Sequence, residues 1–353
     1  MTRPTDPETH AATPVRRAAG HATTRLEAEL AERLSLPREW RIVATASGPA
    51  ALRVLMTLER LRAGRPLRWL APPIMDSRAA TVSTVARARR LDCNAVGVVD
   101  AGDLARVDPE SFDALVVSDP FGLAETLEPA ARLCRRLGKA MIVEGFAAFD
   151  SARRARTGRQ NEALCLAPER PWGTGALGAA LVHADDEADL RSLARGEPRG
   201  RRAEVVAARC TPSEAAVAAA RAELATPRRD SDAPHRQYER LAALAATLGW
   251  TVLGPPRTRG RYATPTNLPL LAPRPLDRNR FTAGALGLRP AGPAPDPRCT
   301  VARSLHARLM LVPCEARLAD VSDEEIRAAL RSALPARSAT ARSAVRDFRR
   351  LSG

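Results

Sequence analysis

Lysine is almost absent from this sequence. Lysine and arginine together number 55 in 353 residues, and only one of them, Lys139, is a lysine. Aromatic residues make up only 3%, so the interleaved aromatic and basic side chains that stack on single-stranded nucleic acid are missing. The net charge of +15 still favours an acidic partner, such as nucleic acid, an acidic protein or a phosphorylated ligand. The even spread of arginine along the chain is equally typical of a biased amino-acid composition.

Long apolar runs and metal-binding motifs are also missing. No stretch approaches the ~20 apolar residues of a membrane span, and residues 1–20 lack the apolar core of a secretory signal. We therefore expect a cytoplasmic protein with no membrane contact. The five histidines show no metal-ligand spacing, and the six cysteines form no CxxC pair. The sequence thus predicts no metal site, and it favours buried free thiols.

Strand-like and helix-like segments alternate along the first part of the chain. We expect helices at 24–34, 50–61, 82–90 and 127–137, and strands at 41–45, 67–71, 95–99, 114–117 and 140–143. Such alternation predicts a largely parallel sheet with helices on both of its faces.

The later part of the chain has a different pattern. Long helices are expected at 211–225 and 237–248, and strands at 250–253, 267–271 and 307–311. A last helix at 322–334 begins with a capping box of Ser322 and Glu325. We divide the chain into a flexible arm (1–23), a large α/β domain (24–230), a small C-terminal α+β domain (231–336) and a basic tail (337–353).

Several segments, taken in order, resemble a known family. They are RLEAELAERL with VATASGPAAL, LRWLAPPIMDSRAAT, VSDPFGLAETLEPAARLCRRLGKAMIVEGFAAF, CLAPERPWGTGALGAALV, RCTPSEAAVAAARAEL and RLMLVPCEARLADVSDEEIRAAL. Their order and spacing between residues 22 and 336 resemble the DegT/StrS-type sugar aminotransferases, of the fold-type I pyridoxal-phosphate class. The resemblance implies an aminotransferase-like large domain with a mostly parallel sheet, plus a small C-terminal α+β domain. It also implies an active site shared in a homodimer, or in a heterodimer with an intact aminotransferase relative.

The resemblance breaks at the positions that carry the family's chemistry. In the family, a lysine forms the Schiff base with the cofactor, and an acid keeps the ring nitrogen protonated. Here the lysine position is Arg170, which stays protonated and forms no imine. The acid position is Gly145, which leaves Glu144 one residue earlier, on the opposite face of its strand. Pro49 replaces the threonine of the phosphate loop, and Cys165 replaces the serine before the lysine.

The place of Lys139 leads to the same expectation without any alignment. It follows Gly138 at a helix-to-strand turn, just before the expected strand 140–143, and therefore at the amino-terminal edge of the sheet. Ligands of open parallel sheets bind beyond the carboxyl-terminal edge. We therefore expect no bound cofactor, pyridoxal phosphate included, and no conventional transamination.

The residues around the former cofactor cavity remain candidates for binding an anionic small molecule. They are Arg170, Ser47, Gly48, Asp76, Arg78, Asp119, Glu144 and Cys165. The run Gly173–Gly178 also fits the spelling of a dinucleotide-binding loop, but such a loop needs a helix after it, and residues 179–182 are strand-like.

Three functions compete on this sequence. The first is a pseudoenzyme or partner subunit in sugar or secondary-metabolite biosynthesis. The second is a cofactor-independent enzyme that acts on a phosphorylated or nucleotide-sugar substrate in the old cavity. The third is a binder of nucleic acid or of an acidic protein.

Overall fold

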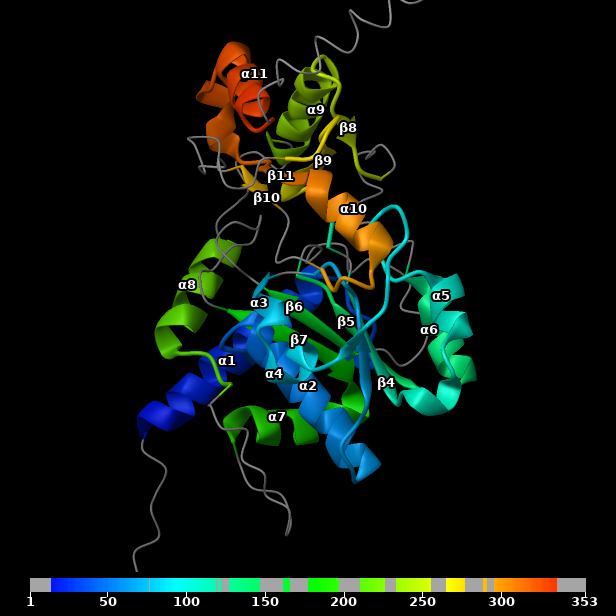
Figure 1. Cartoon of the computed structure of the whole chain (residues 1–353). Coiled ribbons are helices and arrows are strands. Elements are labelled where there is room, and N and C mark those ends of the chain that lie inside the picture. Colours follow the sequence, from blue (N-terminus) through cyan, green and yellow to red (C-terminus); the bar gives the residue numbers. More distant parts are fainter. Residues whose placement is uncertain are drawn as a thin grey trace, which may run out of the picture.

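The computed structural model describes residues 14–75, 77–118, 120–121, 127–146, 161–165, 177–196, 210–225, 233–254, 265–276, 288–290 and 295–334. These residues build two sheets, one of seven strands and one of four (Figure 1). The expected architecture, a large α/β domain with a mostly parallel sheet followed by a smaller α+β part, is confirmed.

The seven-stranded sheet has the order β1-β7-β6-β5-β4-β2-β3. All neighbours in it pair in parallel except β7, which is antiparallel to β1 and to β6. Its strands are β1 (Trp40–Thr45), β2 (Trp69–Ala71), β3 (Arg89–Arg90), β4 (Ala114–Ser118), β5 (Ala140–Glu144), β6 (Asn161–Cys165) and β7 (Gly178–His183). The central strands are apolar on both faces, as is usual for a sheet that is covered on both sides.

Two sets of helices cover the two faces of this sheet. On one face, α2 (Gly48–Ala63), α3 (Ser77–Ala80), α4 (Ser83–Ala86) and α7 (Glu187–Arg195) share one apolar core with the sheet. On the other face lie α1 (Pro14–Arg33) and α8 (Glu214–Ala225), with α5 (Ala101–Arg106) and α6 (Glu128–Arg136) further along the sheet. This face assignment decides where each side chain at the ends of the strands points.

The four-stranded sheet is antiparallel throughout, in the order β10-β11-β9-β8. Its strands are β8 (Thr251–Val252), β9 (Asn267–Leu271), β10 (Arg289–Pro290) and β11 (Leu309–Pro313). Helices α9 (Ala233–Ala246) and α11 (Asp323–Ser332) pack on it, and α11 begins with the expected capping box of Ser322 and Glu325.

Helix α10 (Thr300–Arg308) lies between the two sheets (Figure 1). The Asp92 carboxylate, which follows β3 of the large sheet, accepts hydrogen bonds from the amides of Val301 (2.9 Å) and Ala302 (3.0 Å). Burial alone would raise the pKa of Asp92, but these amide donors lower it. Asp92 therefore caps a helix of the small domain from the large one, and it ties the two sheets together.

Three expected elements differ from the structure for local reasons. The predicted helix 82–90 ends at Ala86, because Arg89–Arg90 pair with β2 as β3. No strand forms at 95–99, because the Asn94 side chain accepts the amides of Val96 and Val98 in a turn. Helix α1 begins at Pro14, inside the segment 1–23 that was predicted to be a flexible arm.

Other elements were missed or shifted. Strand β6 and helix α7 were not predicted. The predicted strand 307–311 begins two residues later, as β11, because α10 occupies the residues up to Arg308. These short elements carry little local signal, since pairing with distant strands determines them.

Candidate functional site

The carboxyl-terminal ends of the parallel strands meet at one edge of the large sheet. Strands β1, β4, β5 and β6 end there, and the antiparallel β7 begins there. In register, Ser118 lies beside Glu144, and Gly178 lies beside both Thr45 and Cys165. Open parallel sheets bind their ligands beyond this edge.

Helix α2 begins at this edge with two unused backbone donors. The Ser47 hydroxyl accepts the Ala50 amide (3.2 Å), and Pro49 has no N–H to offer. Within the described residues, the amides of Ser47 and Gly48 donate to no partner. Helix α2 has 16 residues, and the N-terminus of such a helix favours a negative charge. Two of the predicted residues, Ser47 and Gly48, therefore offer amides to an anion.

The backbone at the start of α2 lies directly against β7. A Cβ atom on Gly178 would lie 2.2 Å from the Ser47 carbonyl carbon and 2.4 Å from the Gly48 nitrogen. Only glycine permits this contact, because the neighbouring atoms are backbone and have no rotamer to change. Gly178 also decides whether the run Gly173–Gly178 is a dinucleotide-binding loop, because β7 begins at this residue. The element after it is a strand, so the run is no dinucleotide-binding loop.

Glu144 is buried and turned toward the α2 face, as its place one residue before Gly145 predicted. Its carboxylate accepts a short hydrogen bond from the Ser118 hydroxyl and another from the Phe146 amide (2.9 Å). These contacts fix Glu144 between β4 and β5. Sequence reasoning missed Ser118, whose role depends on a strand pairing that lies 26 residues away in the chain.

At Gly145, the former acid position, the Glu162 side chain occupies the space that a side chain would take. A Cβ atom there would lie 2.3 Å from Oε1 of Glu162 and 3.2 Å from Cδ2 of Leu164, both on the adjacent strand β6. The Gly145 amide donates to the Ala163 carbonyl (2.9 Å), which fixes the distance between the two strands. Glu162 was missed in the sequence analysis because strand β6 itself was not predicted.

The remaining candidates cannot be placed as side chains. Asp76, Asp119 and Arg170 lie outside the described residues. Arg78 lies in α3 and Cys165 ends β6, but only their backbone positions are described.

Lys139 lies at the opposite, amino-terminal edge of the sheet, as predicted. It directly precedes β5, and its Nζ atom lies 5.3 Å from the centroid of the Phe112 ring. The five residues of β5 separate it from Gly145 by roughly 17 Å, at ~3.3 Å per residue. The chain therefore has no lysine within reach of the carboxyl-terminal edge.

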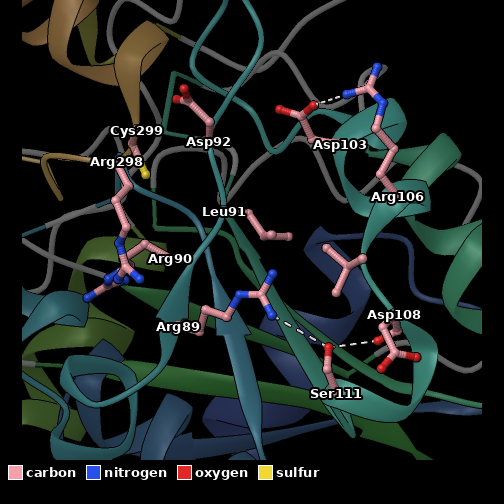
Figure 2. A pocket seen from close by; sticks show the side chains of 11 residues that line it. Arg89, Arg90, Leu91, Asp92, Asp103, Arg106, Asp108, Ser111, Arg298 and Cys299 are labelled. Atoms are coloured by element: carbon pink, nitrogen blue, oxygen red, sulfur yellow. Dashed lines mark hydrogen bonds and ion pairs between the residues drawn. The ribbon is translucent and has the colours of Figure 1, made fainter.

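A separate hollow of about 460 Å³ lies between β3, α5 and the start of α10 (Figure 2). Its lining has four arginines and three aspartates, and two of the arginines form ion pairs: Arg106 with Asp103, and Arg298 with Asp296. Arg90 contacts the Pro72 carbonyl (3.0 Å) and no carboxylate among the described residues, and burial lowers its pKa. The hollow is thus largely neutralised from within, and we do not assign the functional site to it.

Thiols and metal ligands give no further site in the described part of the chain. Five of the cysteines there are free and buried, as predicted. Burial raises the pKa of Cys93 to about 12 and those of Cys134 and Cys299 to about 11, so these thiols are poor nucleophiles. Within the same residues, no three histidine, cysteine or acidic side chains gather as metal ligands do. Nor does any described helix have the length and apolarity to cross a membrane.

Comparisons with known proteins agree on the fold. No family model and no curated protein matches the chain. Among solved structures, 3-amino-5-hydroxybenzoic acid synthase has a TM-score of 0.69 at 14% identity, over 94% of this chain and 98% of its own. A DegT/DnrJ/EryC1/StrS aminotransferase from Brucella abortus has a TM-score of 0.66 at 17% identity, over 90% of this chain and 95% of its own. A putative PLP-dependent aminotransferase from Bacillus cereus has a TM-score of 0.69 at 14% identity, over 90% of this chain and 94% of its own.

These similarities correct one expectation. The sequence led us to expect no cofactor, but two structures that share this fold are described as aminotransferases, one of them as dependent on pyridoxal phosphate. The expectation of no cofactor is therefore contradicted. The described residues fit this group in part: two backbone amides are available for a phosphate, and a carboxylate lies beside Gly145, but no lysine is within reach. Over 90% of its length, the protein shares its fold with a DegT/DnrJ/EryC1/StrS aminotransferase.

Proposed function

We propose that this protein is an aminotransferase-fold homologue of sugar or secondary-metabolite biosynthesis that carries pyridoxal phosphate without attaching it to a lysine. One observation carries the proposal. The single lysine of the chain, Lys139, contacts Phe112 at the amino-terminal edge of the sheet, roughly 17 Å along β5 from the edge where ligands bind. Without that attachment, the protein transfers no amino groups by itself.

Two groups of this chain support the binding of the cofactor at this edge of the sheet. The amides of Ser47 and Gly48, at the N-terminus of α2, would hold the phosphate. Pyridoxal phosphate, when bound, supplies an electron sink for bonds next to an amino group. The buried Glu144, bonded to Ser118 and Phe146, keeps the ends of β4 and β5 together beneath this place.

We further propose that the protein works as a subunit of a dimer, either with a second copy or with an intact aminotransferase relative. In the family that it resembles, each site is completed by a neighbouring subunit. A chain that holds the fold but lacks the attachment lysine suits the role of a partner that stabilises or regulates such a site. The anionic cofactor, or a substrate carrying a phosphate, is the small molecule that this arrangement favours.

Two measurements test the proposal. Purified protein should bind one equivalent of pyridoxal phosphate in equilibrium dialysis, yet borohydride reduction followed by peptide mass spectrometry should find no adduct on the chain. Arg170→Lys should gain a covalent adduct at residue 170 but no amino transfer, because Gly145 and Pro49 still lack the acid and the amide donor. Arg170→Gln is the matched control, since it removes the guanidinium group without supplying an amine.

Either of two results would contradict the proposal. Amino transfer from a sugar amine by the wild-type chain alone would show that a lysine-free route exists. Failure to bind pyridoxal phosphate at any concentration that saturates ordinary aminotransferases would show that the fold has lost the cofactor as well as its attachment.

A further inference from the structure

Gly145 and Glu162 fit together across two neighbouring strands. Glu162 lies on β6 opposite Val143 of β5, so its side chain leaves the sheet on the same face as Val143 and Gly145. From there its carboxylate extends along β5, and Oε1 lies where the Cβ atom of a side chain at 145 would be, 2.3 Å from that position. The Cδ atom of Glu162 lies 3.1 Å from the same position. The carboxylate thus occupies the space of the side chain that Gly145 lacks.

We propose that Glu162 supplies, from the neighbouring strand, the carboxylate that position 145 lost, and that it faces the ring nitrogen of pyridoxal phosphate. This inference rests on the proposed function. A carboxylate next to a pyridine nitrogen accepts a hydrogen bond from the protonated ring and stabilises its positive charge. An acid reaching over a glycine from β6 serves this purpose as well as an acid attached to β5.

The other acid near this place does not serve it. Glu144 is 1% exposed and points to the opposite face of the sheet, where Ser118 and Phe146 hold both of its oxygens. Glu162 is half-buried, and its carboxylate lies beside Gly145, just past the end of β5. Of the two, only Glu162 lies on the face to which a side chain at 145 would point.

The exchange of an acid for a glycine is testable by stability alone. Gly145→Asp should lower the unfolding temperature, because its Cβ atom displaces Glu162 and two carboxylates then share one space. Adding Glu162→Gly should recover at least about half of that loss, since it removes both the clash and the repulsion. If the double variant is no more stable than Gly145→Asp, the two residues do not share the space and the inference is overturned.

Ligand binding tests the proposed role directly. Glu162→Gln keeps the shape of the side chain and removes its charge. We expect it to weaken the binding of pyridoxal phosphate by about tenfold, the value of one charge-assisted hydrogen bond. An analogue with carbon in place of the ring nitrogen should bind the wild type and Glu162→Gln equally. The ¹⁵N chemical shift of ring-labelled cofactor should change from that of a protonated to that of an unprotonated nitrogen in the variant.

The outcomes separate the two proposals. If the wild type binds both compounds and Glu162→Gln loses affinity for both alike, Glu162 only shapes the pocket and this inference is overturned, while the proposed function stands. If the wild type binds neither compound, the proposed function fails and this inference falls with it.

Discussion

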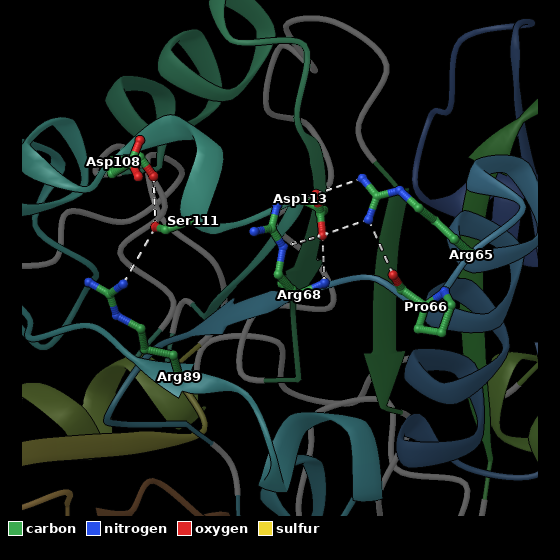
Figure 3. A network of polar contacts seen from close by, with 7 residues as sticks. All are labelled: Arg65, Pro66, Arg68, Arg89, Asp108, Ser111 and Asp113. Atoms are coloured by element: carbon green, nitrogen blue, oxygen red, sulfur yellow. Dashed lines mark hydrogen bonds and ion pairs between the residues drawn. The ribbon is translucent and has the colours of Figure 1, made fainter.

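The two edges of the large sheet use their polar side chains in different ways. At the amino-terminal edge, the charges neutralise one another. The Asp113 side chain is only 6% exposed, and it receives hydrogen bonds from the guanidinium groups of Arg65 and Arg68 and from the Arg68 amide (Figure 3). Nearby, Lys139 lies over the Phe112 ring. Every one of these groups precedes a strand, and each has its partner within the fold.

At the carboxyl-terminal edge, two backbone donors are left without an acceptor among the described residues. The amides of Ser47 and Gly48 have no acceptor among the described residues, and the Glu162 carboxylate reaches forward over Gly145. Two glycines shape this edge: Gly178 admits the Ser47–Gly48 backbone, and Gly145 admits Glu162. The comparison shows why Lys139 is structural. It belongs to the edge whose charges are already satisfied.

The largest effect should come from filling the glycine contact at the carboxyl-terminal edge. We expect Gly178→Ala to cost at least about 3 kcal/mol of unfolding free energy, because the new Cβ atom would lie 2.2 Å from backbone atoms that cannot rotate away. Urea unfolding of the wild type and the variant measures this loss of free energy. Gly138→Ala, at the other edge, is the matched control. Gly138 has φ +65° and open space around it. Alanine there should therefore cost only the strain of a left-handed backbone, about 1 kcal/mol of unfolding free energy. Equal losses would show that the two edges are packed alike.

The next effect concerns the buried acid between β4 and β5. Glu144→Ala should cost about 2–3 kcal/mol, because it leaves the Ser118 hydroxyl and the Phe146 amide without their acceptor in a buried place. On a Ser118→Ala background the same change should cost less, since one of the stranded donors is already gone. Additive losses in this double-mutant cycle would mean that the Ser118–Glu144 hydrogen bond contributes nothing of its own.

Sequence reasoning succeeded where the signal was local. The buried runs at 114–117, 140–143 and 267–271 became strands, and Ser322 with Glu325 became the expected cap. Each of these depends on residues within a few positions of one another. The same is true of Lys139, whose place follows from the turn at Gly138 just before it.

The site was harder to predict because its contacts are distant in the chain. Asn94 ends the expected strand 95–99 through side-chain hydrogen bonds that compete with the sheet. Glu162 meets Gly145 only because β6 pairs with β5, and Gly178 meets Ser47 only because β7 pairs with β1. The missing residues were visible in the sequence, but the Glu162 carboxylate, which we propose as a replacement from another strand, was not. This is how the expectation of an empty cofactor site arose.

A smaller, pH-dependent effect is expected at the amino-terminal edge. Hydrogen bonds from Arg68 and Arg65 hold the pKa of Asp113 well below its usual range. Its stabilisation is therefore complete above the unfolded-state pKa of about 3.9, begins to weaken below it, and is lost as the pH falls through the lower folded-state pKa. Asp113→Asn should lower the unfolding temperature by about 1–3 °C at pH 7, and the difference should shrink toward pH 3. Because Arg65 and Arg68 are more than half exposed, salt should also reduce it. A difference that is constant from pH 7 to pH 3 would rule out the ion pairs as its cause.

The smallest effect should follow the loss of the only lysine. Lys139→Met removes a partly exposed cation from the face of Phe112, a contact worth about 0.5 kcal/mol, so the unfolding temperature should shift by no more than about 1 °C. Binding of pyridoxal phosphate at one equivalent should not change at all, because β5 separates this side chain from the ligand edge by roughly 17 Å. Lys139→Arg, which keeps the cation over the ring, is the control for any change in stability. If borohydride trapping at equimolar cofactor labels the peptide that contains Lys139, or if Lys139→Met abolishes binding, then the lysine serves the cofactor after all. In that event ligand binding is not confined to the carboxyl-terminal edge of the sheet, and the charges at the amino-terminal edge are not purely structural.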